Sequence, residues 1–187
     1  AVIGKGQAAA IAAGSRQGKR RMSESAKPRM AVIGLGSMGF GMATSLRRAG
    51  FEVTGCDVSA DSVARFVADG GKGAKTPAEA AKDADIVVSV VVNAAQTETI
   101  LFGANGAAET LAKGAVFVSS ATMDPDVARR LAKQLEASGR HYLDAPISGG
   151  AQRAAQGELT ILASGSPAAF ARARPALDAM AAKLYEL

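Results

Sequence analysis

Three glycines and one acid are spaced in the pattern that proteins use to bind a dinucleotide. Gly34, Gly36 and Gly39 form a G-x-G-x-x-G directly after the apolar run Met30–Ile33. The first glycine permits a tight turn, the second lets the backbone approach a pyrophosphate, and the third lets the next helix pack closely. Asp57 ends a second apolar run, where a carboxylate can accept hydrogen bonds from ribose hydroxyls. This order of strand, glycines, helix, strand and acid predicts a dinucleotide-binding fold.

The residues after the glycines have the spacing of a helix that packs on a sheet. Met38, Met42, Leu46 and Ala49 fall on one helical face, and Gly50 follows as a stop. The N-terminus of such a helix offers free N–H groups and a partial positive charge to phosphates. We therefore expect the glycine turn and this helix to hold the pyrophosphate together.

Strand and helix patterns alternate along the rest of the chain, as a parallel sheet with crossover helices requires. The β-branched run at 86–92 is typical of a strand buried on both faces. We therefore predict an α/β fold, a Rossmann doubly wound and mostly parallel sheet, and we expect Pro175 to break or restart the final helix. The expected strands are 30–33, 51–56, 86–92, 115–119, 140–144, 159–163 and 183–187, and the expected helices are 61–68, 76–82, 124–139 and one from 166 onward.

Charge separates the start of the chain from the rest. The sequence has 187 residues and a formal net charge of +5, and residues 1–21 carry five basic residues and no acid. From Met22 onward the other 17 of the 22 basic residues balance 17 acids, so no basic surface points to nucleic acid. We expect residues 1–27 to be a disordered leader or an upstream extension, with an organellar transit segment as the alternative. Residues 28–187 are expected to form the dinucleotide-binding Rossmann domain.

Composition argues against several other kinds of site. The apolar stretch Ala8–Ala13 is too short to span a membrane, so no membrane partner is expected. Cys56 is the single cysteine, which excludes a disulfide framework within the chain and fits a reducing, cytoplasmic location. We interpret Cys56 as a small buried strand residue and the sole histidine, His141, as structural, and we expect no metal site.

Small polar residues gather in the loops that follow the expected strands. In an open parallel sheet, ligands bind outside the carboxyl ends of the strands. Asp124 is interpreted as a helix cap, whereas Ser148, Gly149 and Gly150 precede no obvious helix and are expected to contact a ligand. The polar residues suit a ribose, a nicotinamide amide or a carboxylate. The loops are 34–39, 92–96, 119–125 and 144–150, and they hold Asn93, Ser119, Ser120, Thr122, Asp144, Ser148, Gly149 and Gly150.

Three of these motifs together resemble the β-hydroxyacid dehydrogenases, a family that includes 3-hydroxyisobutyrate dehydrogenase and tartronate semialdehyde reductase. The resemblance runs from about Met30 to the end of the chain. The motifs that carry it are Ile33–Gly39, Ser120–Pro125 and Asp144–Gly150. Three shorter segments look most like the L-threonate dehydrogenase branch of the family, and these are Val91–Gln96, Leu101–Gly103 and Leu162–Ser166.

The resemblance implies NAD as the cofactor and the oxidation of a secondary alcohol beside a carboxylate, with L-threonate going to 2-oxo-tetronate. It implies a small hydroxy-acid substrate and, for the full-length enzyme, a homo-oligomer. The cofactor-binding residues it implies are Ile33, Gly34, Leu35, Gly36, Ser37, Met38, Gly39, Asp57, Val92, Asn93 and Thr122. The substrate-binding residues it implies are Thr122, Ser148, Gly149 and Gly150. Ala121 departs from the family pattern, because many relatives carry serine there.

The family's catalytic lysine has no counterpart in this sequence. In the family that lysine, which removes the hydroxyl proton, lies on a helix that would begin beyond Leu187, and the family's all-helical C-terminal domain would follow it. Lys183 lies near the start of a strand-like run, so we do not expect it to act as a base. The sequence leaves three alternatives. The missing half is lost, it is supplied by another chain, or the protein is a non-catalytic NAD-binding module. For the substrate, 3-hydroxyisobutyrate and tartronate semialdehyde remain alternatives to L-threonate.

Overall fold

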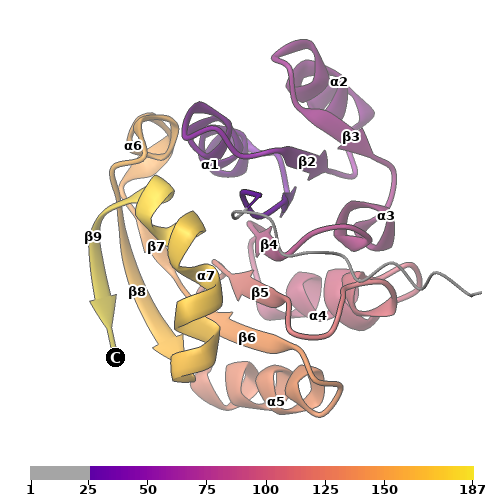
Figure 1. The fold of residues 1–187 in the computed structure, drawn as a ribbon, viewed down its shortest axis with the longest axis vertical. Helices are drawn as coiled ribbons and strands as arrows, with labels where there is room; N and C mark the ends of the chain where they lie inside the picture. Colours follow the sequence, from indigo (N-terminus) through magenta and orange to yellow (C-terminus); the bar gives the residue numbers. More distant parts are fainter. Residues whose placement is uncertain (1–25) are drawn as a thin grey trace, which may run out of the picture.

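A computed structural model describes residues 26–187, in which helices cover both faces of a nine-stranded sheet (Figure 1). Residues 1–25, which hold most of the expected leader or extension, lie outside the described residues. The strands are β1 (Met30–Ile33), β2 (Val53–Cys56), β3 (Lys72–Ala74), β4 (Ile86–Ser89), β5 (Val116–Ser119), β6 (His141–Asp144), β7 (Ile147–Ser148), β8 (Leu159–Gly165) and β9 (Ala181–Glu186). The helices are α1 (Ser37–Arg48), α2 (Ala60–Ala68), α3 (Pro77–Ala81), α4 (Ala94–Phe102), α5 (Pro125–Glu136), α6 (Gly150–Gln156) and α7 (Pro167–Met180), with a 3-10 turn, η1, at Ala107–Glu109. None of the helices in residues 26–187 combines the length and apolarity that crossing a bilayer needs.

The order of the strands places a crevice beside the glycine turn. From one edge the sheet runs β3-β2-β1-β4-β5-β6-β8-β7, and β9 pairs with β8. The strands β1 to β6 pair in parallel, whereas β8 is antiparallel to both β6 and β7. Because β2 and β4 lie on opposite sides of β1, the winding reverses there, and such a reversal opens a crevice at the carboxyl ends of the strands. The predicted α/β, doubly wound and mostly parallel fold is confirmed.

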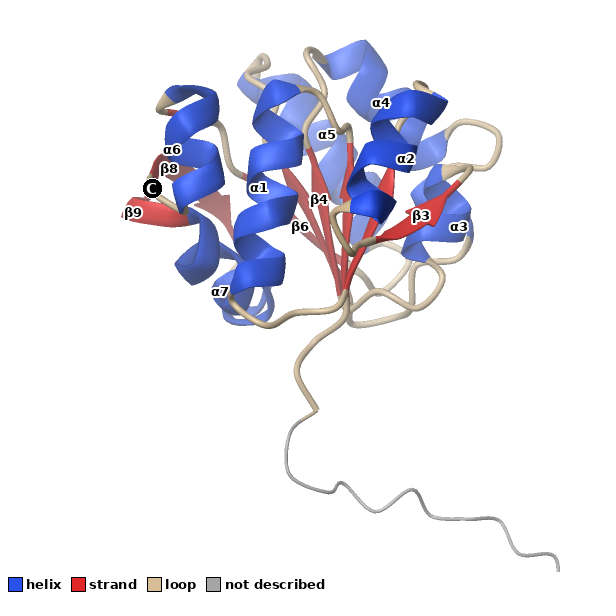
Figure 2. Cartoon of the chain, turned by 90° about the horizontal axis from the view of Figure 1, so that it is seen from above, coloured by secondary structure: helices blue, strands red, loops and turns tan. Residues whose placement is uncertain are grey.

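Both faces of the sheet are covered, which explains why its central strands are apolar on both sides (Figure 2). The consecutive residues Val87 and Val88 of β4 point to opposite faces, and both are fully buried. Val88 belongs to a core shared with Leu46 of α1 and with residues of α2, α6 and α7. Val87 belongs to a core shared with Leu131 of α5 and with residues of α3 and α4. The central strands therefore form a buried middle layer, and their ends are accessible.

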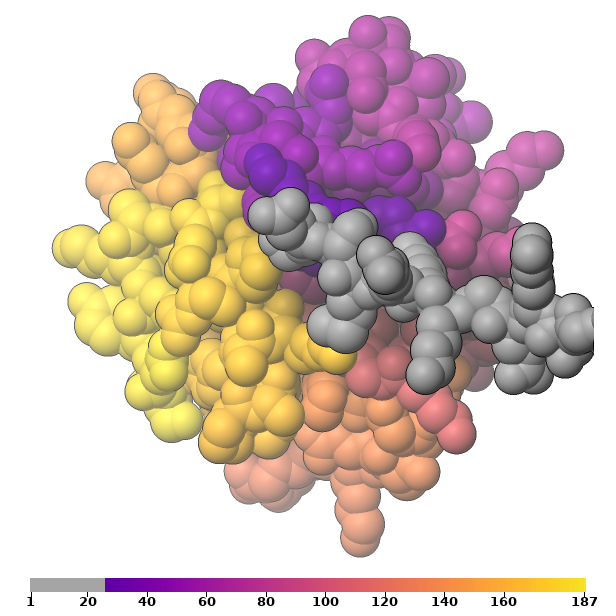
Figure 3. Space-filling view, viewed as in Figure 1, coloured from indigo at the N-terminus to yellow at the C-terminus, as the bar shows by residue number. Residues whose placement is uncertain are grey.

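Helix α1 packs on α6, although more than a hundred residues separate them in the sequence (Figure 3). A Cβ atom at Gly41 would lie 2.7 Å from the backbone nitrogen of Ala155, so glycine is needed for this close approach. The guanidinium of Arg48 donates a hydrogen bond of 2.7 Å to the carbonyl of Ala155. The predicted packed face of α1 is confirmed at Met42 and Leu46, which are fully buried, whereas Ala49 is the exposed C-cap.

Strand β4 is shorter than the predicted 86–92. It ends at Ser89, in register with the last residues of its neighbours, Ile33 of β1 and Ser119 of β5. Beyond that point Val92 is 81% exposed, so the apolar run continues into a loop. β-branched residues favour an extended chain, but only paired neighbours decide where a strand stops.

Some elements were not predicted at all. β3 and β7 are three and two residues long, too short to give a pattern. α4 follows Asn93, which the sequence assigned only to a loop. α6 corrects the expectation that no helix follows Gly149 and Gly150. These two glycines have φ values of +142° and +79°, and this left-handed backbone turns the chain from β7 directly into the helix.

Helix α7 continues through Pro175, which corrects the expected break. Proline removes one N–H from the helix and tends to kink it. Downstream of it, however, Ala176, Leu177 and Met180 are fully buried against the sheet. We conclude that burial of this last helical turn outweighs the loss of one hydrogen bond.

The last strand, β9, lies at an edge of the sheet. It pairs with β8 on one side only, and Tyr185 and Leu187 are 51% and 80% exposed. An edge strand with exposed apolar side chains invites pairing with other chains. We therefore expect the 187-residue chain to self-associate as its concentration rises, and light scattering would measure this.

A matched variant tests whether β9 is responsible for the association. Tyr185→Lys places a charge on the exposed part of the edge strand and should lower the apparent mass of the particles. Ala151→Lys, an exposed position on α6 away from that edge, should leave the mass unchanged. A wild-type chain that stays monomeric at high concentration would contradict the expectation.

Candidate functional site

Two glycines of the G-x-G-x-x-G are required by the protein itself. Gly34 has a φ of +97°, and a Cβ atom there would lie 2.3 Å from the carbonyl oxygen of Val90. A Cβ atom at Gly39 would lie 1.8 Å from the carbonyl oxygen of Gly34. Glycine at these positions therefore lets the turn close against the end of β4 and lets α1 pack on the turn.

Gly36 is different, because no atom beyond its own chain neighbours lies within 4 Å of the place where its Cβ would be. Its φ of −64° is one that any residue can adopt, so neither packing nor backbone conformation requires glycine there. Gly36 is the N-cap of α1, no side chain caps this helix end, and the first turn holds no acid. The open space therefore lies against free N–H groups at the positive end of a helix, which suits a pyrophosphate.

Asp57 is held against the glycine turn by two backbone N–H groups. Leu35 donates to one carboxylate oxygen at 2.6 Å and Ser59 donates to the other at 2.8 Å. The carboxylate is therefore fixed in orientation, and each oxygen keeps a lone pair for a ribose hydroxyl. The next residue, Val58, is fully exposed and carries no charge.

A cleft of about 380 Å³ joins the glycine turn to the ends of β4 and β5. We call it the glycine cleft, and its lining residues are Gly36, Ser37, Met38, Gly39, Val90, Val91, Val92, Ser120, Ala121, Thr122 and Ile147. None of these residues has a titratable side chain, so the described part of the cleft can bind a ligand but supplies no proton acceptor. Any general base must reach the cleft from elsewhere.

The structure brings most of the predicted cofactor residues together. Six of them line the glycine cleft: Gly36, Ser37, Met38, Gly39, Val92 and Thr122. Ile33, Gly34, Leu35 and Asp57 form the strand end, the turn and the anchored carboxylate beside it. Asn93 lies at the same strand end, where its side chain accepts a hydrogen bond of 2.9 Å from the N–H of Gln96. Asn93 therefore caps α4, whatever else it does.

The predicted substrate residues are more dispersed. Thr122 lines the cleft, whereas Ser148, Gly149 and Gly150 are exposed at the β7–α6 corner and do not line it. Their neighbour Ile147 does line it, so this corner lies at the edge of the cleft. Because α6 begins at Gly150, the argument that no helix follows these glycines no longer supports ligand contact. The remaining arguments for ligand contact at Ser148, Gly149 and Gly150 are their position beside the cleft and the family resemblance.

Four lining residues were missed by the sequence reasoning: Val90, Val91, Ala121 and Ile147. All four have apolar side chains without a reactive group, so a search for residues that could do chemistry does not select them. Their signal lies in position, because Val90, Val91 and Ala121 lie one or two residues beyond the end of β4 or β5, and Ile147 begins β7. A ligand pocket is lined mostly by such side chains.

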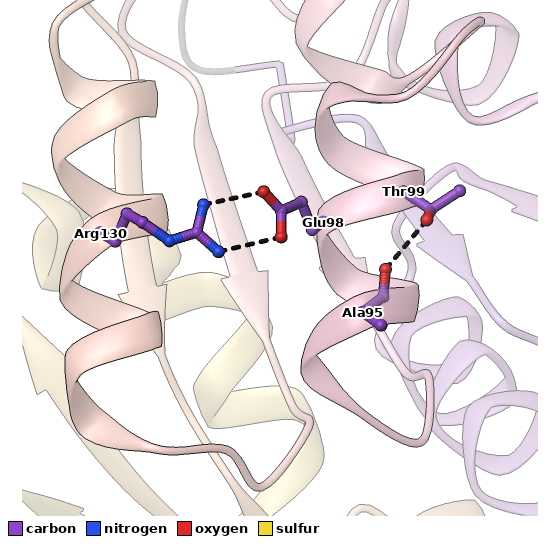
Figure 4. A network of polar contacts seen from close by, with 4 residues as sticks. All are labelled: Ala95, Glu98, Thr99 and Arg130. Carbon is purple, nitrogen blue, oxygen red and sulfur yellow. Dashed lines mark hydrogen bonds and ion pairs between the residues drawn. The ribbon is translucent and has the colours of Figure 1, made fainter.

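An ion pair fixes the two helices that follow the cleft loops. Arg130 of α5 donates to both carboxylate oxygens of Glu98 of α4, at 2.8 and 2.9 Å, and its guanidinium lowers the pKa of Glu98 (Figure 4). In α4 the hydroxyl of Thr99 also donates to the carbonyl of Ala95 at 2.9 Å. Asp124 caps α5 through the N–H of Asp126, as predicted. The ion pair therefore joins α4 to α5, and the Asp124 cap fixes the start of α5.

Burial shifts the pKa of three groups near the sheet. Cys56 is 3% exposed, and burial raises the pKa of its thiol to about 11, so it is the inert strand residue that was predicted. Burial likewise raises the pKa of Tyr142 to about 12 and raises that of Asp144. None of these groups lines the glycine cleft. In residues 26–187 no three His, Cys, Asp or Glu side chains cluster as metal ligands.

Comparison with known proteins agrees with this geometry. The model of a family described as the NAD binding domain of 6-phosphogluconate dehydrogenase matches residues 29–187. The chain belongs to this family. Its cofactor is NAD, and the residues that the structure presents at the glycine turn fit that cofactor.

The relatives of the chain include hydroxyacid dehydrogenases. It is 49% identical over 156 residues to L-threonate dehydrogenase of Cupriavidus necator, covering 83% of this chain and 52% of that protein. It is 35% identical to the mitochondrial 3-hydroxyisobutyrate dehydrogenase of Mus musculus, covering 84% and 47%. The crystal structure of 3-hydroxyisobutyrate dehydrogenase from Salmonella typhimurium superposes with a TM-score of 0.82 at 42% identity, covering 86% and 56%.

The coverage of these relatives is itself informative. The chain spans about half the length of the curated relatives it matches. The part that the chain shares with them matches an NAD-binding family model over residues 29–187.

Proposed function

We propose that residues 28–187 are the NAD-binding domain of a dehydrogenase that oxidises the secondary hydroxyl of a small hydroxy acid. The observation that carries the proposal is the open cradle at Gly36, with free helix N–H groups on one side and the anchored carboxylate of Asp57 on the other. L-threonate is the favoured substrate, with 2-oxo-tetronate as product. The identity of 49% to an L-threonate dehydrogenase, against 35% to a 3-hydroxyisobutyrate dehydrogenase, supports this choice.

The described residues have distinct parts in this function. The N-terminus of α1 and the turn from Ile33 to Gly39 hold the pyrophosphate, and Asp57 accepts hydrogen bonds from the adenosine ribose. Val92 and Asn93 border the cofactor at the end of β4. Thr122 lies where the nicotinamide meets the substrate. When bound there, NAD would supply the hydride acceptor for the alcohol carbon.

The β7–α6 corner supplies the substrate contact in this proposal. Ser148 offers a hydroxyl, and Gly149 and Gly150 offer backbone N–H groups near the start of α6, which suits a carboxylate. The corner is exposed and adjoins the glycine cleft through Ile147. We expect 3-hydroxyisobutyrate and tartronate semialdehyde, the alternatives, to bind the same corner more weakly.

None of the described residues that line the glycine cleft can accept a proton, so we propose that the base reaches the cleft from elsewhere. Positioned general-base help is worth about a hundred- to ten-thousand-fold in rate. We infer that the full-length enzyme supplies the base from a further domain or from another chain. We also propose that this enzyme is a cytoplasmic homo-oligomer without a nucleic-acid or membrane partner.

The first test separates cofactor binding from turnover. The purified 187-residue chain should bind NAD in titration calorimetry. Its NADH absorbance with L-threonate, D-threonate, 3-hydroxyisobutyrate or glycerate should stay at the blank rate. Turnover above the blank would show that the chain holds a base. Lys183→Ala would then be the first variant, with Lys133→Ala as its matched control.

A second test addresses the substrate. Residues 29–187 can replace the matching region of the Cupriavidus necator enzyme, which supplies the missing half. The hybrid should reduce NAD with L-threonate in preference to 3-hydroxyisobutyrate. A folded, NAD-binding hybrid that prefers another acid would refute L-threonate and leave the cofactor assignment standing. A hybrid that binds NAD but oxidises none of these acids would favour a non-catalytic module.

A further inference from the structure

One cation beside the β7–α6 corner has no charged partner. Arg153 of α6 is exposed, and none of the ion pairs among residues 26–187 involves it. Other arginines of the described chain donate side-chain hydrogen bonds, as Arg48 does to Ala155 and Arg130 to Glu98, whereas Arg153 donates none there. Its guanidinium is therefore available to a ligand.

The side chain of Arg153 runs back over the corner. Its Cβ and Cδ atoms both lie 3.2 Å from the place where a Cβ of Gly149 would be. Side chains in a helix point toward its N-terminus, so the stem of Arg153 covers the turn before it. The guanidinium begins one bond beyond Cδ, which brings it within reach of a ligand bound at Ser148, Gly149 and Gly150.

Helix α6 is fixed in place through the residues next to Arg153. Ala154 is fully buried, and its Cβ lies 3.0 Å from the place where a Cβ of Gly41 would be. The carbonyl of Ala155 accepts a hydrogen bond of 2.7 Å from Arg48 of α1. Because α1 begins at the glycine turn, these contacts fix the backbone of Arg153 relative to the glycine cleft.

The corner offers room for an anion but no charge of its own. Ser148, Gly149 and Gly150 are neutral, and none of the residues that line the adjoining glycine cleft is titratable. No atom beyond its chain neighbours lies within 4 Å of the place where a Cβ of Gly150 would be. A carboxylate that loses its water there needs an opposite charge, because burying an unpaired ion costs much free energy.

We propose that Arg153 binds the carboxylate of the hydroxy acid and so selects acids over uncharged alcohols. This inference deepens the proposed function and rests on it. A guanidinium can donate two parallel hydrogen bonds to a carboxylate, and such charge-assisted bonds are about twice as strong as neutral ones. Ser148 and the backbone N–H groups orient the carboxylate, whereas Arg153 supplies the charge that the corner lacks.

The hybrid enzyme that carries residues 29–187 tests this assignment through KM. In it, Arg153→Met keeps an unbranched stem over Gly149 and removes the charge. KM for L-threonate should rise at least about tenfold, because the lost pair binds the ground state and the transition state alike. For the same reason kcat should change less than about threefold, and the Kd for NAD less than about twofold.

Two further variants of the hybrid serve as comparisons. Arg153→Lys keeps the charge but loses the parallel pair of hydrogen bonds, so it should raise KM by less than Arg153→Met does. Arg172→Met removes an exposed arginine of α7 that lines a separate hollow with Asp85, at the opposite end of the strands. It should leave KM for L-threonate within about twofold of the unsubstituted hybrid.

An uncharged analogue separates the ion pair from a general loss of substrate binding. The amide of L-threonic acid keeps the hydroxyl groups and lacks the carboxylate. The unsubstituted hybrid should prefer L-threonate to this amide in kcat/KM. Arg153→Met should reduce that preference at least about tenfold, since the substitution removes the partner that only the acid uses.

Several results would overturn the proposal. An equal rise in KM for the acid and the amide would mean that Arg153 acts on the shape of the corner. A matching loss of NAD affinity would place Arg153 at the cofactor instead. If Arg153→Met oxidised L-threonate with an unchanged KM, the assignment would fail and the proposed function would stand. A hybrid that oxidises no hydroxy acid would refute both.

Discussion

Replacing Gly36 with alanine is expected to weaken NAD binding at least about tenfold while the fold stays intact. A methyl group at this position meets no atom beyond its own chain neighbours within 4 Å and needs no change in φ, so the free energy of unfolding should change by no more than about 1 kcal/mol. The same methyl group would occupy the space beside the free N–H groups of α1, where the pyrophosphate must come close. We expect the affinity for NAD to fall at least about tenfold, or about 1.4 kcal/mol, in titration calorimetry.

The neighbouring glycine provides the matched control for this prediction. In Gly39→Ala the new Cβ would lie 1.8 Å from the carbonyl oxygen of Gly34, so the helix must move away from the turn. That substitution should lower the free energy of unfolding by about 2–4 kcal/mol in urea denaturation, whether or not NAD is present. Equal loss of stability in the two variants would mean that Gly36 is structural. If a folded Gly36→Ala variant bound NAD with the affinity of the wild type, the pyrophosphate would have to bind somewhere other than the space beside Gly36.

The second large effect concerns the choice between NAD and NADP. The carboxylate of Asp57 is fixed by the N–H groups of Leu35 and Ser59, and it would repel a 2′-phosphate on the ribose. The exposed Val58 beside it offers no compensating positive charge. The wild-type chain should therefore bind NAD at least about tenfold more tightly than NADP, since charged hydrogen bonds contribute about 1.5–3 kcal/mol each. Parallel calorimetric titrations with the two cofactors measure this difference.

Substitutions at the same place should reverse the preference. Asp57→Ser with Val58→Arg removes the repelling charge and adds a cation, so NADP should become the tighter ligand. Val58→Arg alone keeps the carboxylate and should leave NAD preferred, which makes it the control for the added charge. Asp57→Asn preserves the shape of the side chain and should reduce the discrimination without reversing it. Equal binding of NAD and NADP by the wild type would show that Asp57 does not touch the ribose.

The turn, the caps and the buried strands could be predicted because their causes are local. Gly34 has a positive φ and Gly39 is in contact with the turn five residues before it, so both requirements lie within a single loop. Asp124 caps its helix through the N–H group of Asp126, two residues ahead. Asp57 could be recognised from its distance to the glycines, because strand and helix lengths in this unit vary little.

The features that were predicted wrongly depend on partners far away in the sequence. β4 ends where its neighbours β1 and β5 end, at Ser89, and nothing in the run of valines marks that point. Pro175 is tolerated because the helical turn beyond it is buried against other strands. α6 depends on its packing against α1 at Gly41. Burial of this kind contributes more free energy than the local preferences that oppose it.

The polar residues at the ends of β5 and β6 show the same division. The sequence singled out Ser119 and Asp144 as residues at strand ends, and it placed them in the same group as Ser120 and Thr122. Pairing in register assigns them to the opposite face, away from the glycine cleft and beside Tyr142. The sequence alone shows which residue types lie at the end of a strand. Side chains alternate between the two faces of a sheet, so a shift of one residue in the register exchanges the faces. Only the folded sheet fixes that register, and it therefore decides which face each residue lies on.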